Sequence, residues 1–148
     1  MKKNKYILEE SFGYHIGSLG VNIKRRMDEY LKPHNLTHLQ FSILMSLYKN
    51  KVTTQKEILR LTYGDEASIT RLVDRLESKG YLNRVTDTQD KRKKKLILTQ
   101  EGIELTETLT SYACEVNQEL VKVLDKSEIE TFLKLFQKVH ASLEEKQY

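Results

Sequence analysis

Residues 65–99 read DEASITRLVDRLESKGYLNRVTDTQDKRKKKLILT, and this stretch decides the fold. In its first half, aliphatic residues recur at the i, i+3, i+4 and i+7 spacing of a single helix face, namely Ile69, Leu72, Val73 and Leu76. Gly80 follows, and glycine adopts without steric penalty the left-handed conformation in which many helices end. The first half therefore predicts an amphipathic helix that stops at Gly80.

The second half predicts two short antiparallel strands, residues 81–85 and 96–99, because both are mostly apolar and contain β-branched or aromatic side chains. Five consecutive cations lie between them: Lys91, Arg92, Lys93, Lys94 and Lys95. Because these charges repel one another, we expect the loop to project into solvent until a polyanion neutralises it. The alternative interpretation is an ordinary solvated surface loop.

The other face of the predicted helix is polar and presents Ser68, Arg71, Arg75 and Ser78. Exposed hydroxyl and guanidinium groups beside a basic hairpin are suited to holding duplex DNA. We expect Arg71 to read bases and Arg75 to contact a phosphate. In the alternative interpretation, the two arginines only form ion pairs within the helix, with Glu66, Asp74 or Glu77.

The chain before this stretch predicts three helices. Apolar residues recur every three or four positions up to Lys32, which precedes Pro33, and they are Phe12, Ile16, Leu19, Ile23, Met27 and Tyr30. A capping box of Thr37 with Gln40 opens a second helix that is apolar on much of its circumference and should be central: Phe41, Leu44, Leu47 and Tyr48. Thr54 with Glu57 opens the brief third helix, which breaks at Tyr63 and Gly64 and forms the first half of a helix-turn-helix.

The chain after this stretch predicts two long helices. Thr99 can cap the first, which runs through Leu105 to Val123, and Ser127 with Glu130 starts the second, which runs through Phe132 to Leu143. A winged core of about 50 residues does not need this much extra apolar surface, so we infer that the terminal helices join two chains.

The predicted fold is mainly α with a small β-hairpin wing, a winged helix-turn-helix with long terminal helices. Residues 36–99 would form the DNA-binding lobe, and residues 1–33 and 101–148 the dimerisation helices, all within one domain.

Composition narrows the class of protein. The 148-residue chain has no apolar run near the ~18 residues of a membrane span and no signal-peptide pattern, so we expect a soluble, cytoplasmic protein without a membrane partner. Lys and Arg outnumber Asp and Glu by 13 to 7 in residues 49–95, whereas acidic residues prevail by 10 to 5 in residues 96–148. The basic excess thus lies in the predicted DNA-binding part.

The motifs in this region resemble, in order and spacing, those of the multiple antibiotic resistance regulator (MarR) family of bacterial winged helix-turn-helix repressors. The family's wing signature Asp-x-Arg-x-Lys is matched by Asp90-Lys91-Arg92-Lys93-Lys94. Further matches are Ser68-Ile69-Thr70-Arg71, the segment from Leu76 to Gly80, Arg84, and Leu98-Thr99-Gln100-Glu101-Gly102. The resemblance extends from end to end of the chain.

The resemblance implies roles for these residues. Arg92 would enter the minor groove at the wing tip, with Asp90 holding its guanidinium, while the neighbouring lysines contact phosphates. The major groove would be faced by Ser68, Thr70, Arg71 and Arg75. A dimer would read a pseudo-palindromic operator, as a repressor that a small phenolic or lipophilic effector releases. The expected effector pocket comprises Tyr14, Ile16, Gly17, Tyr48 and Tyr63.

Other residues invite narrower hypotheses. Cys114 has no basic neighbour within four positions that would lower its pKa, so we expect a buried or inert thiol. His34 and His38 are four apart but do not share a helix face, so we expect no metal site. Gly13, Gly17 and Gly20 fall on one side of the first helix, which suggests either close helix packing at the dimer contact or space for a small molecule.

Two other classes of function are an enzyme and a protein-interaction module. The sequence contains no Ser/His/Asp or Cys/His arrangement, phosphate-cradling glycine loop or carboxylate pair that can be placed, so we expect neither an enzyme nor a cofactor. The strongest alternative to a DNA-binding regulator is a winged-helix module that binds an acidic protein and never touches DNA.

Overall fold

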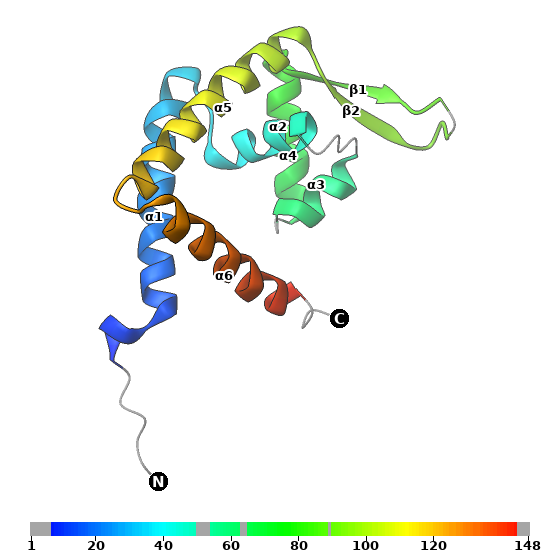
Figure 1. Cartoon of the computed structure of the whole chain (residues 1–148). Coiled ribbons are helices and arrows are strands. Elements are labelled where there is room, and N and C mark those ends of the chain that lie inside the picture. Colours follow the sequence, from blue (N-terminus) through cyan, green and yellow to red (C-terminus); the bar gives the residue numbers. More distant parts are fainter. Residues whose placement is uncertain (1–6, 50–53, 63–64, 89, 145–148) are drawn as a thin grey trace. The chain divides into compact units, whose positions relative to one another are not determined.

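The computed structural model describes residues 7–49, 54–62, 65–88 and 90–144 (Figure 1). It divides into two compact units, Met1–Ala113 and Cys114–Tyr148, and the division falls inside helix α5 (Gln100–Val121). Within the described ranges, no helix is long and apolar enough to cross a membrane.

Helix α2 (His38–Lys49) is the centre of the first unit. It packs against α1 (Phe12–Leu31), α3 (Gln55–Thr62), α4 (Glu66–Ser78) and strand β2 (Lys94–Leu98). Its buried residues include Phe41, Ile43, Leu44 and Leu47, which cover much of the helix circumference. The predicted central position of this helix is therefore confirmed.

Both predicted capping boxes form. The Gln40 backbone N–H donates to the Thr37 hydroxyl at 3.3 Å, and the Gln40 side-chain oxygen accepts the Thr37 N–H at 3.0 Å. Thr54 and Glu57 repeat the reciprocal pattern at the start of α3. These bonds satisfy N–H groups that have no partner within the helix, so they fix where α2 and α3 begin. The predicted break at Tyr63 and Gly64 lies outside the described residues.

Helix α1 begins at Phe12 and ends at Leu31, one residue before the predicted limit. A short 3-10 helix precedes it, η1 (Leu8–Glu10), and another follows it, η2 (Lys32–His34). Its C-terminal part is anchored by Met27 and Leu31, whereas large apolar side chains nearer its start are exposed: Phe12, Tyr14, Ile16, Leu19 and Val21. A Cβ at Gly17 or Gly20 would meet no atom within 4 Å. Packing within one chain therefore does not explain these two glycines.

Helix α4 ends as predicted. Gly80 has φ +77°, its N–H donates to the Glu77 carbonyl at 2.9 Å, and the Tyr81 N–H donates to the Leu76 carbonyl at 3.0 Å. This pair of bonds is the Schellman motif, which reverses the chain direction at the helix end. The reversal leads directly into β1 (Leu82–Thr86).

The antiparallel hairpin pairs Leu82 with Leu98 at its base and Thr86 with Lys94 near its tip. Figure 1 shows it projecting beyond α3 and α4. The predicted limits of the second strand were wrong: Lys94 and Lys95 belong to β2 because they continue the ladder opposite Thr86 and Val85. The basic run is therefore part loop and part strand.

Thr99 joins the hairpin to α5. Its hydroxyl donates to the Gly80 carbonyl at 2.6 Å and accepts the Gly102 N–H at 3.0 Å, so it caps α5 as predicted. The helix lies so close to the preceding turn that a Cβ at Gly102 would lie 1.9 Å from the Tyr81 carbonyl oxygen. Only glycine fits this position without moving the backbone.

The second unit contains the end of α5 and helix α6 (Lys126–Glu144). The prediction that Ser127 and Glu130 start this helix was wrong, because the reciprocal bonds join Asp125 and Glu128, at 2.8 and 2.9 Å. An aspartate is an equally good cap two residues earlier. Val123 lies beyond the end of α5.

Exposed apolar residues mark α6, namely Phe132, Leu133, Leu135, Phe136, Val139 and Leu143. Cys114 is also exposed, so of the two predicted alternatives the buried thiol was wrong, and the inert thiol stays a prediction.

Replacing Gly102 by alanine should destabilise the fold. The added methyl overlaps a backbone carbonyl that cannot rotate away, and overpacking of this kind costs about 2 kcal/mol. Thermal unfolding of G102A should show a Tm several degrees below that of the wild type. Q100A, a change at an exposed position in the same helical turn, is the matched control; equal Tm values for the two variants would contradict the close approach.

Candidate nucleic-acid interface

The start of α4 is fixed by Asp65, whose carboxylate accepts the Ser68 N–H at 2.9 Å. The side-chain and backbone hydrogen bonds from Ser68 lower the pKa of Asp65 below its usual value, so this cap is ionised at neutral pH. Its contribution to stability is present above the unfolded-state pKa and is lost as pH falls through the lowered folded-state pKa. The cap holds the first turn of the predicted reading helix.

Two of the predicted reading residues, Arg71 and Arg75, are exposed on α4, and the Arg71 guanidinium donates to the Ser68 hydroxyl at 3.4 Å. In the part of the chain that the structure describes, neither arginine forms an ion pair with Glu66, Asp74 or Glu77. Both guanidinium groups therefore remain available to a ligand.

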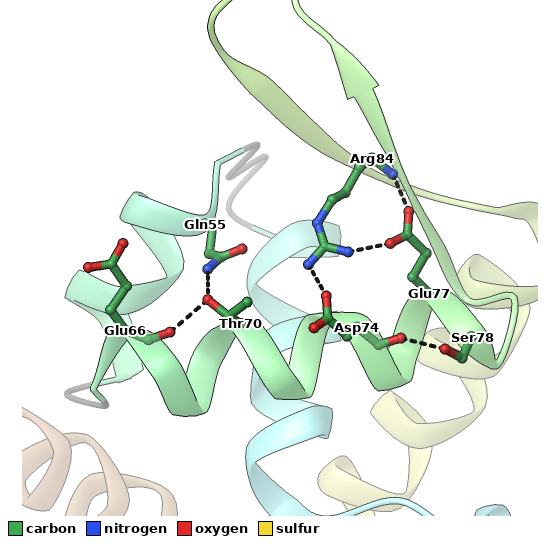
Figure 2. Close-up of polar contacts among 7 residues, drawn as sticks. All are labelled: Gln55, Glu66, Thr70, Asp74, Glu77, Ser78 and Arg84. Atoms are coloured by element: carbon green, nitrogen blue, oxygen red, sulfur yellow. Dashed lines mark hydrogen bonds and ion pairs between the residues drawn. The ribbon is translucent and has the colours of Figure 1, made fainter.

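Thr70 is half-buried, and its hydroxyl is hydrogen-bonded to both α3 and α4. Its hydroxyl donates to the Glu66 carbonyl at 2.8 Å and accepts a hydrogen bond from the Gln55 side-chain amide at 2.5 Å (Figure 2). Thr70 thus links α3 to α4. No local pattern predicts this contact, because the two residues are fifteen positions apart.

The wing, residues 82–88 and 90–98, carries the most exposed of the predicted site residues. The Arg92 side chain is 98% exposed, and its Nε lies 3.9 Å from an Asp90 carboxylate oxygen. That same oxygen accepts the Arg92 backbone N–H at 3.1 Å. Asp90 therefore holds the backbone of the tip closely and the guanidinium only loosely.

Asp87, which sequence reasoning missed, organises the base of the tip. Its buried carboxylate lies 2.5 Å from the Lys95 ammonium and accepts the Asp90 N–H at 3.0 Å, while its own N–H donates to the Lys93 carbonyl at 2.9 Å. Lys95, one of the five predicted cations, is thus held closely by an ion pair within the wing, whereas the side-chain nitrogens of Arg92 and Lys93 lie 3.9 and 3.8 Å from Asp90 carboxylate oxygens. The signal that could have found this contact is an acidic residue placed directly at the end of the first strand.

Arg84 ties the wing to α4 (Figure 2). Its guanidinium donates to Asp74 at 2.5 Å and to Glu77, and its backbone N–H donates to Glu77 at 2.9 Å. The resemblance singled out Arg84 only as part of a motif, without a partner. The structure shows that it engages two carboxylates that were considered as partners for Arg71 and Arg75.

Helices α3 and α4 and the wing surround a concave surface with a volume of about 910 Å³. Helix α3 and the wing supply the cations that line this surface, namely Lys56, Arg60, Arg92, Lys93 and Lys94. The carboxylates of Glu57 and Glu66 also line it. An excess of positive charge in a concavity focuses the field and attracts polyanions. The first half of the helix-turn-helix and the wing tip therefore meet at one basic surface.

The predicted effector residues that the structure describes lie on two helices, α1 and α2. Tyr14 and Ile16 are exposed on α1, and Tyr63 lies outside the described residues. Tyr48 on α2 donates to the Glu107 carboxylate of α5 at 2.9 Å, and this hydrogen bond, with a lesser effect of burial, raises the pKa of Tyr48.

The two histidines considered as metal ligands contact aromatic rings. His34 lies beside Tyr112, which stacks on Tyr30 with ring centroids 4.6 Å apart, and His38 lies beside Phe41. Within the described residues, no group of three or more His, Cys, Asp or Glu side chains could hold a metal ion.

The chain is similar to known proteins of the MarR family. The model of the MarR family matches residues 36–94. The multiple antibiotic resistance protein MarR of Escherichia coli K12 is 33% identical over 116 residues, which are 78% of this chain and 81% of MarR.

Two solved structures that are similar contain DNA. The Staphylococcus aureus MepR–DNA complex superposes with a TM-score of 0.80 at 29% identity, covering 91% of this chain and 98% of MepR. A mutant of E. coli MarR complexed with operator DNA superposes with a TM-score of 0.75 at 32% identity, covering 86% of this chain and 91% of that one.

Removing the Asp87 carboxylate should loosen the wing tip alone. In D87A, the Asp90 N–H should exchange with solvent about tenfold faster, because a hydrogen bond to a charged group is worth roughly 1.5 kcal/mol or more. Amide hydrogen exchange measures this, with T88A at the exposed neighbouring position as control. Unchanged exchange at Asp90, or equal acceleration in α2, would contradict the local role of Asp87.

Proposed function

The chain belongs to the MarR family, and we propose that it regulates transcription by binding double-stranded DNA as a homodimer. The observation that carries this proposal is the basic concave surface formed by α3, α4 and the wing tip. Beside it, α4 exposes Arg71 and Arg75, which form no ion pair with Glu66, Asp74 or Glu77 among the described residues. A polyanion with grooves is the ligand that this arrangement fits.

Each part of the surface has a proposed task. Helix α4 would enter the major groove, where Arg71 reads base edges, Arg75 contacts a phosphate, and Ser68 lies at the first turn. Thr70 would contribute mainly by holding α3 against α4, since its hydroxyl is already engaged.

The wing would follow the backbone into the adjacent minor groove. Arg92, which is almost fully exposed, would enter the groove itself, where the narrow A·T-rich geometry strengthens the negative potential. The phosphates would be contacted by Lys91, Lys93 and Lys94. Lys95 would act through the wing, because its ammonium is held by Asp87.

The helices outside the DNA-binding lobe of residues 36–99 would form the dimer. Apolar side chains are exposed near the start of α1 and along α6. Contiguous apolar surface of this kind marks an interface. We propose that residues 1–33 and 101–148 of two copies pack together, so that two recognition helices reach successive major grooves of a pseudo-palindromic operator.

Regulation follows from this geometry. In the cytoplasm, the dimer would act as a repressor that a small phenolic or lipophilic effector releases, by changing the spacing of its two DNA-binding lobes. The relatives that the comparisons identify are transcriptional regulators rather than enzymes. Because Tyr14 and Ile16 are exposed on α1, the second chain of the dimer would complete an effector pocket that includes them.

Selection from random duplex DNA tests the function directly. The purified full-length chain should enrich an inverted repeat whose half-site centres lie about one helical turn, roughly 10 base pairs, apart. Size analysis of the complex should give one dimer per duplex. Failure to enrich a motif, together with weak binding that does not strengthen at low salt, would contradict the proposal and favour the protein-interaction module.

Variants of the wing should distinguish the proposed groove contact of Arg92 from the proposed phosphate contacts of Lys93 and Lys94. R92A should lower affinity for the selected duplex by about tenfold or more, because it removes a groove contact. K93A or K94A should reduce the slope of log affinity against log salt by about one without changing the preferred sequence. If a lysine variant instead selected a different site, its proposed phosphate role would be wrong.

A further inference from the structure

Arg84 faces the protein, where it contacts Asp74 and Glu77 of α4. We propose that Arg84 is a positioning residue that makes α4 and the wing bind DNA as one unit, so that Arg92 contributes to binding only while the Arg84 contacts are intact. This inference rests on the proposed DNA-binding function. It concerns a different question, namely how the two DNA contacts are kept in register.

The contacts have the geometry that such a task requires. Arg84 lies in β1 and reaches two acceptors one turn apart on α4, Asp74 and Glu77, through different nitrogens of one planar guanidinium (Figure 2). The Arg84 backbone N–H donates to Glu77 as well, at 2.9 Å. Three bonds in different directions restrain both translation and rotation of the strand relative to the helix.

The Arg84 side chain is also well shielded from solvent. It is only 19% exposed, compared with 98% for Arg92 at the tip of the same hairpin. Water and salt therefore weaken the Arg84 pairs less than an ordinary surface ion pair. Arg84 therefore holds the base of the hairpin, whereas Arg92 at its tip is exposed and only loosely paired with Asp90.

Beyond this anchor, the hairpin projects from the helices (Figure 1). Its base is held by Leu82 and Leu96, which are buried, and by the turn at Gly80. Nearer the tip, the bonds of Asp87 stay within the hairpin. A small rotation at the base therefore displaces the tip by more, and Arg84 is the polar contact that opposes this rotation.

An alternative role for Arg84 is charge neutralisation, because α4 is not a basic helix. It contains the carboxylates of Glu66, Asp74 and Glu77 but only two arginines. Arg84 would then merely cancel two negative charges beside the phosphates. The two accounts make opposite predictions for a protein from which the carboxylates are removed, so they can be separated.

The first experiment is a double-mutant cycle on the duplex recovered by selection. R92A should cost about tenfold in affinity in the wild-type protein but less than about twofold in R84M, because the wing is already misplaced there. R84K should behave like R84M, since an ammonium cannot reproduce the planar fork. Additive losses in the cycle, or wild-type affinity of R84K, would overturn the proposal.

The second experiment uses D74A/E77A, which keeps Arg84 but removes its acceptors. The variant gains two positive charges at the DNA-binding surface, so charge cancellation predicts tighter binding. The positioning account predicts weaker binding and a loss of the R92A effect. Tighter binding with the R92A effect intact would overturn the proposal.

Two controls keep the outcomes distinct. Q100A, which removes the exposed Gln100–Glu104 hydrogen bond and lies outside the proposed DNA contacts and dimerisation helices, should leave affinity unchanged. Thermal unfolding identifies any variant that does not fold. If R84M does not fold, D74A/E77A still provides the test, because its substitutions lie on a partly exposed helix face. If the wild-type protein itself selects no duplex, the proposed function fails; if it binds but the cycle is additive, this inference alone fails.

Discussion

The buried aliphatic row of α4 is the constraint on which the rest of the structure depends. Ile69, Val73 and Leu76 are fully buried, and α4 packs against α2, α3 and β1. Burying one side of a helix determines which residues stand on the other side, because side chains repeat every 3.6 residues. The exposure of Arg71 and Arg75 is thus a consequence of core packing, and each buried aliphatic side chain supports it with about 2 kcal/mol of apolar burial.

A second constraint joins the helix to the wing. The turn at Gly80 sends the chain back along α4, where Thr99 bonds to the turn from one side and Arg84 bonds to the helix from the other. Gly102 lets α5 approach the same turn without a steric clash. Core packing orients the helix, and this junction orients the hairpin relative to it. The two elements proposed to bind DNA are therefore preorganised.

Local patterns in the sequence predicted most of the fold. Helical periodicity located the helices, and the Thr37 and Thr54 boxes and Gly80 marked ends that the structure confirms, because these signals involve neighbours a few residues apart. The sequence did not predict the partners of Arg84, Thr70 or Lys95, since such contacts depend on tertiary packing between distant segments. It also favoured Ser127 over Asp125 as the cap of α6, because both residue types are good N-caps. The DNA-contacting roles of the exposed residues stay predictions.

The central claim is that α4 and the wing occupy adjacent grooves of the same duplex, and directed cleavage from the wing tip tests it most directly. Lys91 can be replaced by cysteine in a C114S background, which leaves a single thiol for an iron chelate and keeps Arg92 intact. The account predicts backbone cuts centred on the minor groove that flanks each half-site, about half a helical turn from the major-groove contact. Cuts centred in the major groove, or no cuts from a protein that is bound to the duplex, would contradict it.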